Sequence, residues 1–475
     1  MDLHLASALD GVALGDRAST LYQHLLDAIV DGRLRAGARV PPTRELAAEL
    51  RVSRGTVTTA YDRLTAEGFL VTRVGSGTFV CRDVVPHRTR HAPVGDVRPR
   101  AVWATLPPPV PDAPPSEFDL SVGGPDTSLF PLAAWRRLVS ATLRPSLLAA
   151  SAYEGQGDEG LRREIARYAG LSRSVVAAPA DVLLTNGAQQ GLDVVTRAVV
   201  DPGDVVVVED PGYTAATRLF ASLGARVVGV PVDDEGLVVA DLPRTARMVY
   251  VTPSHQFPTG AVMSLRRRIA LLEWASRRNA VIVEDDYDSE FRFEDRPLAP
   301  LQSLDRDGRV VYVGSFSKTL MPSLRVGYLI APQSLQFTLK QAKLLTDWQG
   351  DAVTQGALAR FMAEGLLSAH VRRVTRIYAE RRAALLNGLE DLPADVLEVL
   401  PSAAGLHLCT YFVDRTVDDV AVARAAAQAG VSLEPVSVRF LDTAPRPGLA
   451  MGFRRVTADR VPEAIRRLAT VLPRP

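Results

Sequence analysis

The sequence predicts an α/β protein with three parts: a small N-terminal module of helices and a hairpin, a proline-rich linker, and a large domain with a mainly parallel central sheet. Short amphipathic segments and a glycine-centred hairpin pattern occupy the first 81 residues, and prolines crowd residues 82–116. Beyond them, valine-rich apolar runs alternate with segments of helical period. A chain of 475 residues is also too long for one hydrophobic core. We therefore place the domains at 12–81 and 117–475, with a linker at 82–116.

Composition narrows the class of protein. An apolar fraction of 47% and a charged fraction of 23% are ordinary for a soluble globular chain. With 55 basic and 54 acidic residues the net charge is +1, so a polyanionic partner would have to meet a local basic patch. Cys81 and Cys409 are too few and too far apart for a disulfide framework or a metal cluster. No signal pattern or membrane-length apolar run is found. We expect a cytoplasmic protein with no bound metal and no membrane partner.

The N-terminal module predicts three helices and a hairpin. The first helix ends at Gly32, and Thr43 and Ser53 are expected to cap the second and third. Segments 69–73 and 77–80 then pair around Gly75 and Ser76. The apolar positions expected to face inward are Leu21, Leu25 and Ile29 in the first helix, Leu46, Ala47 and Leu50 in the second, and Val57, Tyr61 and Leu64 in the third.

Helix, turn, helix and a two-stranded wing form a layout that reads DNA. An arginine at a helix start is commonly only solvated, so the prediction depends on the joint placement of Arg44, Arg54 and Arg73. The segments 41–47, 52–57, 60–64, 67–69 and 75–80 resemble the GntR-type winged helix-turn-helix. That resemblance implies a double-stranded DNA operator as partner. The residues it implicates in operator contact are Arg44, Ser53, Arg54, Thr56, Thr58, Arg73 and Gly77.

The linker is predicted from its prolines, which fix backbone angles and lack a hydrogen-bond donor. They are Pro86, Pro93, Pro99, Pro107, Pro108, Pro109, Pro111, Pro114 and Pro115. Such a segment is expected to be extended and semi-rigid.

Four apolar runs of the large domain, at 205–208, 248–251, 281–283 and 310–313, are typical of strands covered on both faces. Polar residues follow each run, at 209–213, 252–255, 284–287 and 314–318. In parallel α/β sheets ligands bind beyond the carboxyl ends of the strands. We therefore expect a ligand site where these polar segments meet.

Lys318 follows the last of these runs and is one of only three lysines in the chain, with Lys340 and Lys343. Ser315 and Ser317 flank it and Arg325 follows, as expected for a Schiff-base lysine beside a bound phosphate. The alternative interpretation is a solvated charge in a polar loop. The surrounding residues must decide between the two.

Pyridoxal phosphate needs a lysine, a carboxylate for the pyridine nitrogen, a donor near the phenolic oxygen, a flat side chain on the ring and a phosphate site. Asp285 can hold the pyridinium, Tyr287 can reach the phenolic oxygen and Tyr213 can stack on the ring. The phosphate candidates are Gly187, Ala188, Gln189, Ser315, Ser317 and Arg325. Taken alone, these residues could have purely structural roles. Gly187 could belong to a common turn, Asp285 could cap a helix and Tyr213 could be a core residue.

The combination resembles fold-type-I aminotransferases over residues 118–475. The matching segments are Tyr153 with 156–157, 185–190, 210–213, 253–260 and 315–318. A GntR-type head joined by a long linker to an aminotransferase-like domain resembles the MocR subfamily of transcriptional regulators. This resemblance implies pyridoxal phosphate as cofactor and a homodimer with a head-to-tail arrangement. It also implies an effector that is a small amine, an amino acid or the cofactor itself.

Two positions depart from the aminotransferase pattern, and a third departs from the pattern of some MocR regulators. Where an asparagine usually contacts the phenolic oxygen, this chain has Phe257, so Ser254 or His255 is expected to make that contact. Ala450 stands where a carboxylate-binding arginine is usual, three residues before Phe453. Some regulators of the subfamily have an arginine where this chain has Ala215. The candidates for an effector's acid group are Arg439, Arg446 and Arg454.

The leading hypothesis is a pyridoxal-phosphate-dependent transcription regulator that controls a neighbouring operon, for vitamin B6 synthesis or for amino-acid or taurine catabolism, with at most a residual transaminase half-reaction. The first alternative is an active aminotransferase with an attached DNA-binding module. The second is a regulator whose large domain has lost the cofactor and only dimerises.

Overall fold

The computed structural model describes residues 9, 11–82, 96–106, 116–144, 155–293, 299–393 and 395–473. The chain forms two compact units, Met1–Pro99 and Arg100–Pro475. Most of the predicted linker, including every proline except Pro99, lies outside the described residues, and its boundaries stay a prediction. One short helix that we did not predict, α5 (Val102–Thr105), forms within it. Within the described ranges, no helix is long and apolar enough to cross a membrane.

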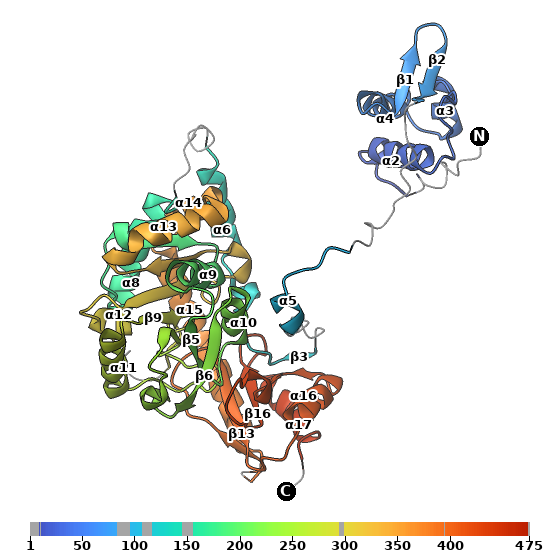
Figure 1. Ribbon diagram of the computed structural model, residues 1–475. Coiled ribbons are helices and arrows are strands. Elements are labelled where there is room, and N and C mark those ends of the chain that lie inside the picture. The colour runs from blue at the N-terminus through green and yellow to red at the C-terminus, as the bar shows by residue number, and fades with distance from the viewer. Residues whose placement is uncertain are drawn as a thin grey trace. The chain divides into compact units, whose positions relative to one another are not determined.

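The N-terminal unit is a three-helix bundle with a hairpin, as predicted (Figure 1). Its elements are α2 (Arg17–Val30), α3 (Thr43–Glu49), α4 (Arg54–Ala66), β1 (Leu70–Arg73) and β2 (Gly77–Val80). All nine apolar positions expected to face inward are buried in one core cluster. The hairpin pairs Arg73 with Gly77 at its closed end.

One of the two predicted caps is confirmed. Ser53 precedes α4, and its hydroxyl accepts a hydrogen bond from the backbone of Thr56 at 3.1 Å. The prediction for Thr43 is wrong, because Thr43 is the first residue of α3 and Pro42 holds the capping position. The ψ angle of 143° at Pro42 keeps the backbone extended up to the first helical residue. The Thr43 hydroxyl instead lies 3.4 Å from Nε of Arg54.

The large unit contains an eight-stranded sheet in the order β4-β11-β10-β9-β8-β5-β6-β7. Strands β11 and β7 run opposite to the others. The strands are β4 (Val182–Thr185), β5 (Val205–Asp210), β6 (Arg226–Asp233), β7 (Gly236–Leu237), β8 (Ala246–Val251), β9 (Val281–Asp286), β10 (Val310–Ser315) and β11 (Gly327–Ile330). The four predicted runs form the adjacent parallel strands β5, β8, β9 and β10, so their carboxyl ends share one edge.

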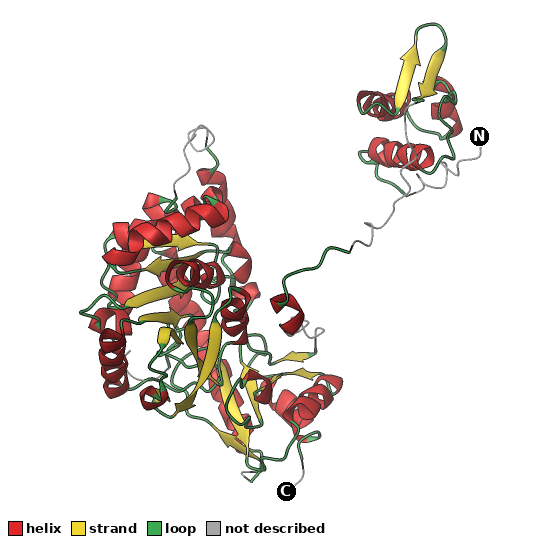
Figure 2. Cartoon of the chain, in the orientation of Figure 1, coloured by secondary structure: helices red, strands yellow, loops and turns green. Residues whose placement is uncertain are grey.

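Helices cover both faces of this sheet (Figure 2). Along β10, Val311 and Val313 belong to the core cluster that includes α9 and α13, whereas Tyr312 belongs to the cluster that includes α8 and α14. This alternation follows from the period of two in a strand. The helices are α6 (Leu132–Thr142), α8 (Glu159–Arg173), α9 (Ala188–Val199), α10 (Thr214–Ser222), α11 (Leu265–Arg278), α12 (Leu301–Leu304), α13 (Gln333–Asp347) and α14 (Ala352–Ala363).

The C-terminal part of the same unit has its own core and a four-stranded antiparallel sheet, β12-β13-β16-β15. Its elements are α15 (Leu366–Glu390), β12 (Leu397–Val399), β13 (His407–Phe412), α16 (Asp419–Gln428), β15 (Glu434–Pro435), β16 (Gly448–Gly452) and α17 (Val461–Ala469). A further pair, β3 (Phe118–Asp119) with β14 (Val431–Ser432), ties the start of the large unit to this part. Residues 121–124 are thereby brought close to the main sheet's carboxyl edge.

Candidate functional site

A cavity of about 380 Å³ lies at the carboxyl edge of the main sheet. Strand ends form one side of it, and the segments after β3 and around β13 and β15 form the other. Its lining residues are Val122, Gly123, Ala188, Gln189, Tyr213, Tyr250, Thr252, Phe257, Asp285, Tyr287, Asp288, Ser315, Ser317, Lys318, Pro322, Arg325, Leu406, His407, Glu434 and Arg439. Segments more than 300 residues apart in the sequence therefore share one site.

Lys318 reaches into this cavity from the loop after β10. Its Nζ donates a hydrogen bond to the carbonyl oxygen of Gly123 at 2.8 Å. Burial lowers the pKa of the Lys318 amine, and the nearby carboxylates of Asp288 and Asp285 oppose that effect. Burial thus favours the neutral, nucleophilic amine at this position.

Asp285 lies at the end of β9 and is almost fully buried. The hydroxyl of Tyr250, on the adjacent strand β8, donates to its Oδ2 at 2.8 Å. The other oxygen, Oδ1, is buried and has no hydrogen-bond partner among the described residues. Burial raises the pKa of Asp285 to about 7, although the bond from Tyr250 acts in the opposite direction. The site therefore holds a carboxylate oxygen that lacks a positive partner.

The first turn of α9 and Arg325 form the anion-binding end of the cavity. Gly187 precedes α9 with a φ of +81° and offers no side-chain cap, so the amides of Ala188 and Gln189 begin the helix at the cavity wall. Arg325 donates to the carbonyl oxygen of Asn186 at 2.7 Å. A Cβ at Gly187 would lie 3.0 Å from the Arg325 guanidinium, so only glycine allows this approach.

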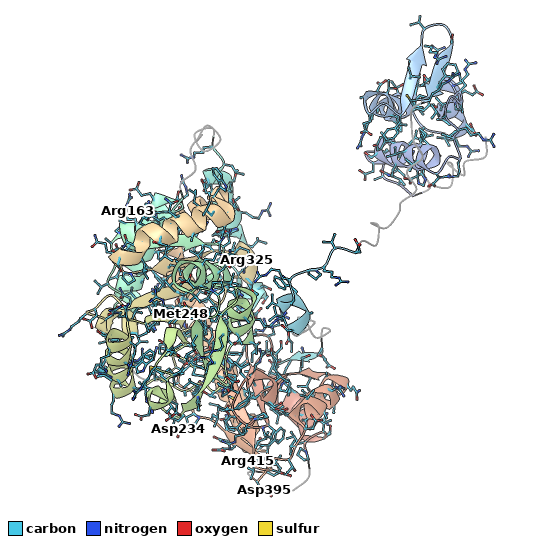
Figure 3. All side chains as sticks on the ribbon, viewed as in Figure 1. Arg163, Asp234, Met248, Arg325, Asp395 and Arg415 are labelled. Atoms are coloured by element: carbon cyan, nitrogen blue, oxygen red, sulfur yellow. The ribbon has the colours of Figure 1, made fainter. Side chains whose placement is uncertain are left out.

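Ser315 and Ser317 line the cavity between Lys318 and this anion-binding end. The Ser315 hydroxyl accepts a hydrogen bond from the backbone of Ser317 at 3.1 Å. Arg325 lies beside α9 (Figure 3), where its φ of +51° follows the short turn at Pro322–Leu324. Helix amides, hydroxyls and a guanidinium therefore converge on one end of the cavity.

Three aromatic rings form the wall between the anion-binding end and Arg439. Tyr213 packs edge-to-face on Phe257, with ring centroids 6.0 Å apart, and Phe257 packs in the same way on Tyr287 at 6.4 Å. The Arg439 guanidinium lies 5.3 Å from the centre of the Phe257 ring. The position usually held by asparagine in aminotransferases is therefore an apolar contact surface here.

Ser254 and His255, predicted to replace that asparagine, do not line the cavity. Arg173 donates to the Ser254 hydroxyl at 3.0 Å and also pairs with Asp286, which keeps Ser254 within a buried ion-pair cluster. His255 lies one layer behind the cavity, where its Nδ1 is 3.0 Å from the Tyr287 hydroxyl. The prediction of direct contact is corrected for both residues, because their side chains are already engaged beneath the wall.

Of the three arginines predicted for an effector's acid group, only Arg439 lines the cavity. It contacts Glu434 in an ion pair and lies 3.0 Å from the Thr214 hydroxyl. Arg446 pairs with Glu398 and stacks on Tyr411. Arg454 donates to the Gly124 carbonyl oxygen at 2.9 Å and to the Ser121 hydroxyl at 3.0 Å.

In the N-terminal unit, Arg44, Arg54 and Arg73 are all exposed, and Thr56 and Thr58 are partly exposed on α4. Ser53 is occupied as the cap of α4. Gly77 has a φ of +110°, a conformation that other residues rarely adopt. Arg54 is bonded to the Thr43 hydroxyl and Arg73 lies over the Phe79 ring, but all three arginines keep their guanidinium groups at the surface.

Several cavity residues were missed by sequence reasoning, chiefly Tyr250, Asp288, His407, Gly123 and Glu434. Tyr250 lies within an apolar run and has the pattern of a core residue. Gly123 has one usable signal, the pair Gly123-Gly124 after a short apolar segment. His407 and Glu434 begin strands of the C-terminal part, and no local pattern connects them to the sheet edge.

Comparison with known proteins matches both units to families. Residues 118–469 match the aminotransferase class I and II family, and residues 17–80 match the bacterial regulatory proteins of the gntR family. The chain is 38% identical to the probable rhizopine catabolism regulatory protein MocR of Rhizobium meliloti, over 94% of this chain and 92% of that protein. It is 34% identical to the pyridoxine biosynthesis transcriptional regulator PdxR of Corynebacterium glutamicum, over 91% of each.

Among solved structures, the large unit is similar to Pyrococcus horikoshii kynurenine aminotransferase, which was solved in complex with PMP. The TM-score is 0.69 at 29% identity, covering 74% of this chain and 90% of that one.

Proposed function

The chain belongs to the MocR-type regulators of the GntR family, in which a winged helix-turn-helix is joined to an aminotransferase-like domain, and from this premise we propose that pyridoxal phosphate bound at Lys318 controls its binding to operator DNA. The observation that supports this most is the unpartnered buried oxygen of Asp285 in the cavity that also holds the Lys318 amine. A buried carboxylate oxygen without a partner is costly unless a ligand supplies one.

The residues of the cavity fit this cofactor. Asp285 would hold the pyridine nitrogen as its cation, since Oδ1 needs a positive partner. The α9 amides, Ser315, Ser317 and Arg325 would hold the phosphate. Tyr213 would cover the ring, and Tyr287 would donate to the phenolic oxygen. When bound, pyridoxal phosphate supplies an aldehyde carbon that reacts reversibly with primary amines.

The protein's own residues would make that reaction responsive to an effector amine. Burial lowers the pKa of the Lys318 amine, which favours its nucleophilic form, and its hydrogen bond to Gly123 orients it. An effector amine would compete with Lys318 for this carbon and would free the Lys318 amine. In the cofactor-free structure that amine contacts Gly123, on the segment joined to the C-terminal part through β3 and β14, so engaging or freeing it would change a contact between two parts of the large unit. A ligand shifts a conformational equilibrium only through such differential contacts.

We place an effector's acid group, where it has one, at Arg439. This arginine shares the cavity with Lys318 and is already paired with Glu434, so an acid group would have to compete with that carboxylate. Identifying the genes beside this one would indicate the effector. It would also decide between vitamin B6 synthesis and amino-acid or taurine catabolism.

The proposed assembly is a head-to-tail homodimer. Phe337, Leu345 and Trp348, on α13 and at its end, are 73%, 83% and 59% exposed. Large apolar side chains so exposed on one helix favour a protein partner. Asp347, in the same segment, accepts hydrogen bonds from Asn186 at 2.5 Å and Gln190 at 2.8 Å. The proposed interface is therefore hydrogen-bonded to the loop that would hold the phosphate.

Covalent labelling tests the attachment. The full-length protein is incubated with pyridoxal phosphate, reduced with borohydride, digested and mapped by mass spectrometry. Because the chain has only three lysines, the map is unambiguous. We expect the label on Lys318, its loss in Lys318→Ala, and its retention in the matched control Lys340→Ala. An unlabelled Lys318 would favour a domain that has lost the cofactor and only dimerises.

DNA binding tests the regulatory role. Fluorescence anisotropy with duplexes from upstream of the gene and its neighbours should show specific binding that changes on adding pyridoxal phosphate. Lys318→Ala should bind the same duplex without that change. The proposal fails if the protein binds none of these duplexes, or if the cofactor alters both proteins equally.

The likeness to a kynurenine aminotransferase raises a second candidate, an active aminotransferase. Multiple turnovers of an amino acid and a keto acid would support it, whereas a single half-reaction would not. Ala450, at the usual position of the carboxylate-binding arginine, is buried in an apolar cluster with Cys409, Tyr411 and Val436. That packing argues for the regulator.

A further inference from the structure

His255 lies behind Tyr287 in an enclosed polar cluster that the proposed function does not use. Its Nδ1 is 3.0 Å from the Tyr287 hydroxyl and 3.1 Å from each carboxylate oxygen of Asp288. Its Nε2 is 3.2 Å from the Ser402 hydroxyl. The side chains of His255 and Asp288 are 1% and 2% exposed, so water cannot rearrange these partners.

The acceptors around His255 place a hydrogen on Nδ1. Asp288 presents both carboxyl oxygens to Nδ1, and its Oδ2 also accepts a hydrogen bond from the backbone of Leu406 at 3.3 Å. The Ser402 hydroxyl donates to the Ala404 carbonyl oxygen at 2.9 Å, so it offers an acceptor to Nε2 and does not change the assignment at Nδ1. A lone pair on Nδ1 would face two carboxylate oxygens and be repelled by them. Nδ1 must therefore carry a hydrogen and donate it to Asp288.

A nitrogen that donates cannot also accept, so Tyr287 cannot give its hydroxyl hydrogen to His255. The Tyr287 oxygen is left as an acceptor on the side of His255. Tyr287 also lines the cavity, and within the described residues its hydroxyl has no hydrogen-bond partner other than His255, so its hydrogen is available to a group in the cavity.

The surrounding residues hold His255 in this arrangement. Gly405 has a φ of +81°, and a Cβ there would lie 2.1 Å from Nδ1 of His255, so only glycine fits. The His407 ring lies 4.7 Å from the His255 ring and donates through Nε2 to the Pro258 carbonyl oxygen at 3.0 Å. Burial lowers the pKa of His407 to about 3, so it adds no charge. The other titratable groups near this cluster are Asp285, Asp286, Glu209 and Lys318.

We propose that His255, held by Asp288, is a positioning residue that directs the hydroxyl hydrogen of Tyr287 into the cavity, making Tyr287 the donor to the phenolic oxygen of the bound cofactor. It would compensate for Phe257, which cannot supply the second donor that asparagine gives in aminotransferases. This inference rests on the proposed cofactor binding.

The test measures the pH midpoint of the visible absorbance of full-length protein loaded with pyridoxal phosphate. A donor at the phenolic oxygen stabilises its anionic form, so a weaker donor moves the midpoint to higher pH. We expect Tyr287→Phe and His255→Leu each to raise the midpoint, by about one unit for the larger of the two. In the double variant, His255→Leu should add nothing to Tyr287→Phe, because its effect passes through the Tyr287 hydroxyl.

Two further variants separate this role from general packing. Asp288→Asn preserves size but weakens the hold on Nδ1, and it also removes a negative charge near Lys318, which by itself lowers the midpoint. This direct effect is measured by adding Asp288→Asn to Tyr287→Phe; once it is subtracted, the remaining effect of Asp288→Asn in the wild-type background should raise the midpoint. Ser402→Ala alters only the far side of the ring and should leave the midpoint almost unchanged. An unchanged midpoint in His255→Leu, or a further shift when it is added to Tyr287→Phe, would overturn the inference. A wild-type protein without a visible band would overturn the proposed cofactor binding as well.

Discussion

The cavity has two walls that differ in what they share with aminotransferases. The wall proposed to hold the cofactor, named the cofactor wall, consists of Asp285, Tyr213, Tyr287, Lys318, Arg325 and the first turn of α9. The wall proposed to meet an effector, named the effector wall, consists of Phe257, His407, Glu434 and Arg439. Here the asparagine and the arginine usual in aminotransferases are replaced by Phe257 and Ala450.

The comparison indicates that binding a cofactor and turning over a substrate place different demands on the two walls. An aminotransferase must bind a succession of amino and keto acids in one orientation, which the missing arginine would normally provide. The effector wall instead presents an arginine already paired with a glutamate. A sensor needs only one ligand that changes the contacts of Lys318, so it can keep the first wall and alter the second.

The largest expected effect tests the cofactor wall. Asp285→Asn removes the carboxylate that would pair with the pyridine cation, and breaking a buried charge pair costs about 3–5 kcal/mol. We expect the affinity for pyridoxal phosphate to fall by two orders of magnitude or more. Absorbance titration measures this. Tyr250→Phe, which removes one hydrogen bond but keeps the carboxylate, should lose far less; equal losses in the two variants would contradict the proposed role of Asp285.

The same variant should have the opposite effect on the cofactor-free protein. Burial raises the pKa of Asp285 to about 7 from an ordinary value near 3.9, so the folded chain binds more protons than the unfolded chain between these values. Ionised Asp285 therefore destabilises the empty protein above about pH 7. Asp285→Asn should raise the free energy of unfolding by about 2–4 kcal/mol at pH 8.

This gain should shrink as the pH falls through 7 and vanish near pH 4, where the carboxyl is protonated in both states. Urea unfolding of the cofactor-free protein at several pH values measures it. A gain that does not vary with pH would show that Asp285 is not the titrating group.

The fold was largely predictable because its signals are local. The valine-rich runs that became β5, β8, β9 and β10, and the Ser53 cap, depend on neighbours within a few residues. Thr43 failed as a cap because Pro42, one residue earlier, already held the backbone extended. An error of this kind moves the predicted start of a helix by one residue but leaves the helix itself correctly predicted.

In the site, too, residues with local sequence signals were predictable and residues brought in from distant segments were not. Asp285, Tyr287 and Lys318 stand directly after strands, where parallel topology brings polar residues together. Gly123, His407 and Arg439 reach the cavity only because the C-terminal part folds against the sheet edge, a contact between segments up to about 300 residues apart. The cofactor wall was therefore open to sequence reasoning. On the effector wall the sequence indicated Phe257 and offered Arg439 only as one of three candidates, and it gave no sign of His407 or Glu434. The placement of His255 behind Tyr287 depends on Gly405 and Asp288, which no spacing in the sequence indicates.

A smaller effect tests the anion-binding end of the cofactor wall. Arg325→Gln removes a guanidinium that would contact the phosphate, and a charge-assisted hydrogen bond is worth about 1.5–3 kcal/mol. We expect affinity for pyridoxal phosphate to fall between tenfold and a hundredfold, while affinity for pyridoxal, which lacks the phosphate, changes little. Titration with both compounds measures the difference. An equal loss for both would indicate that Arg325 only supports the loop at Asn186.

The smallest effect tests the effector wall. The loaded protein is titrated with γ-aminobutyrate and with butylamine, which lacks the acid group, and the visible absorbance change gives the midpoint for each. Because an acid group would have to displace Glu434 from Arg439, the preference for the acid-bearing amine should be modest, about tenfold. Arg439→Gln should abolish that preference without changing cofactor affinity. Arg446→Gln is the matched control, since Arg446 is also paired with a glutamate but lies outside the cavity. If Arg439→Gln keeps the preference, another group binds the acid and the proposed role of Arg439 is wrong. Equal midpoints for the two amines in the wild-type protein would indicate an effector without an acid group.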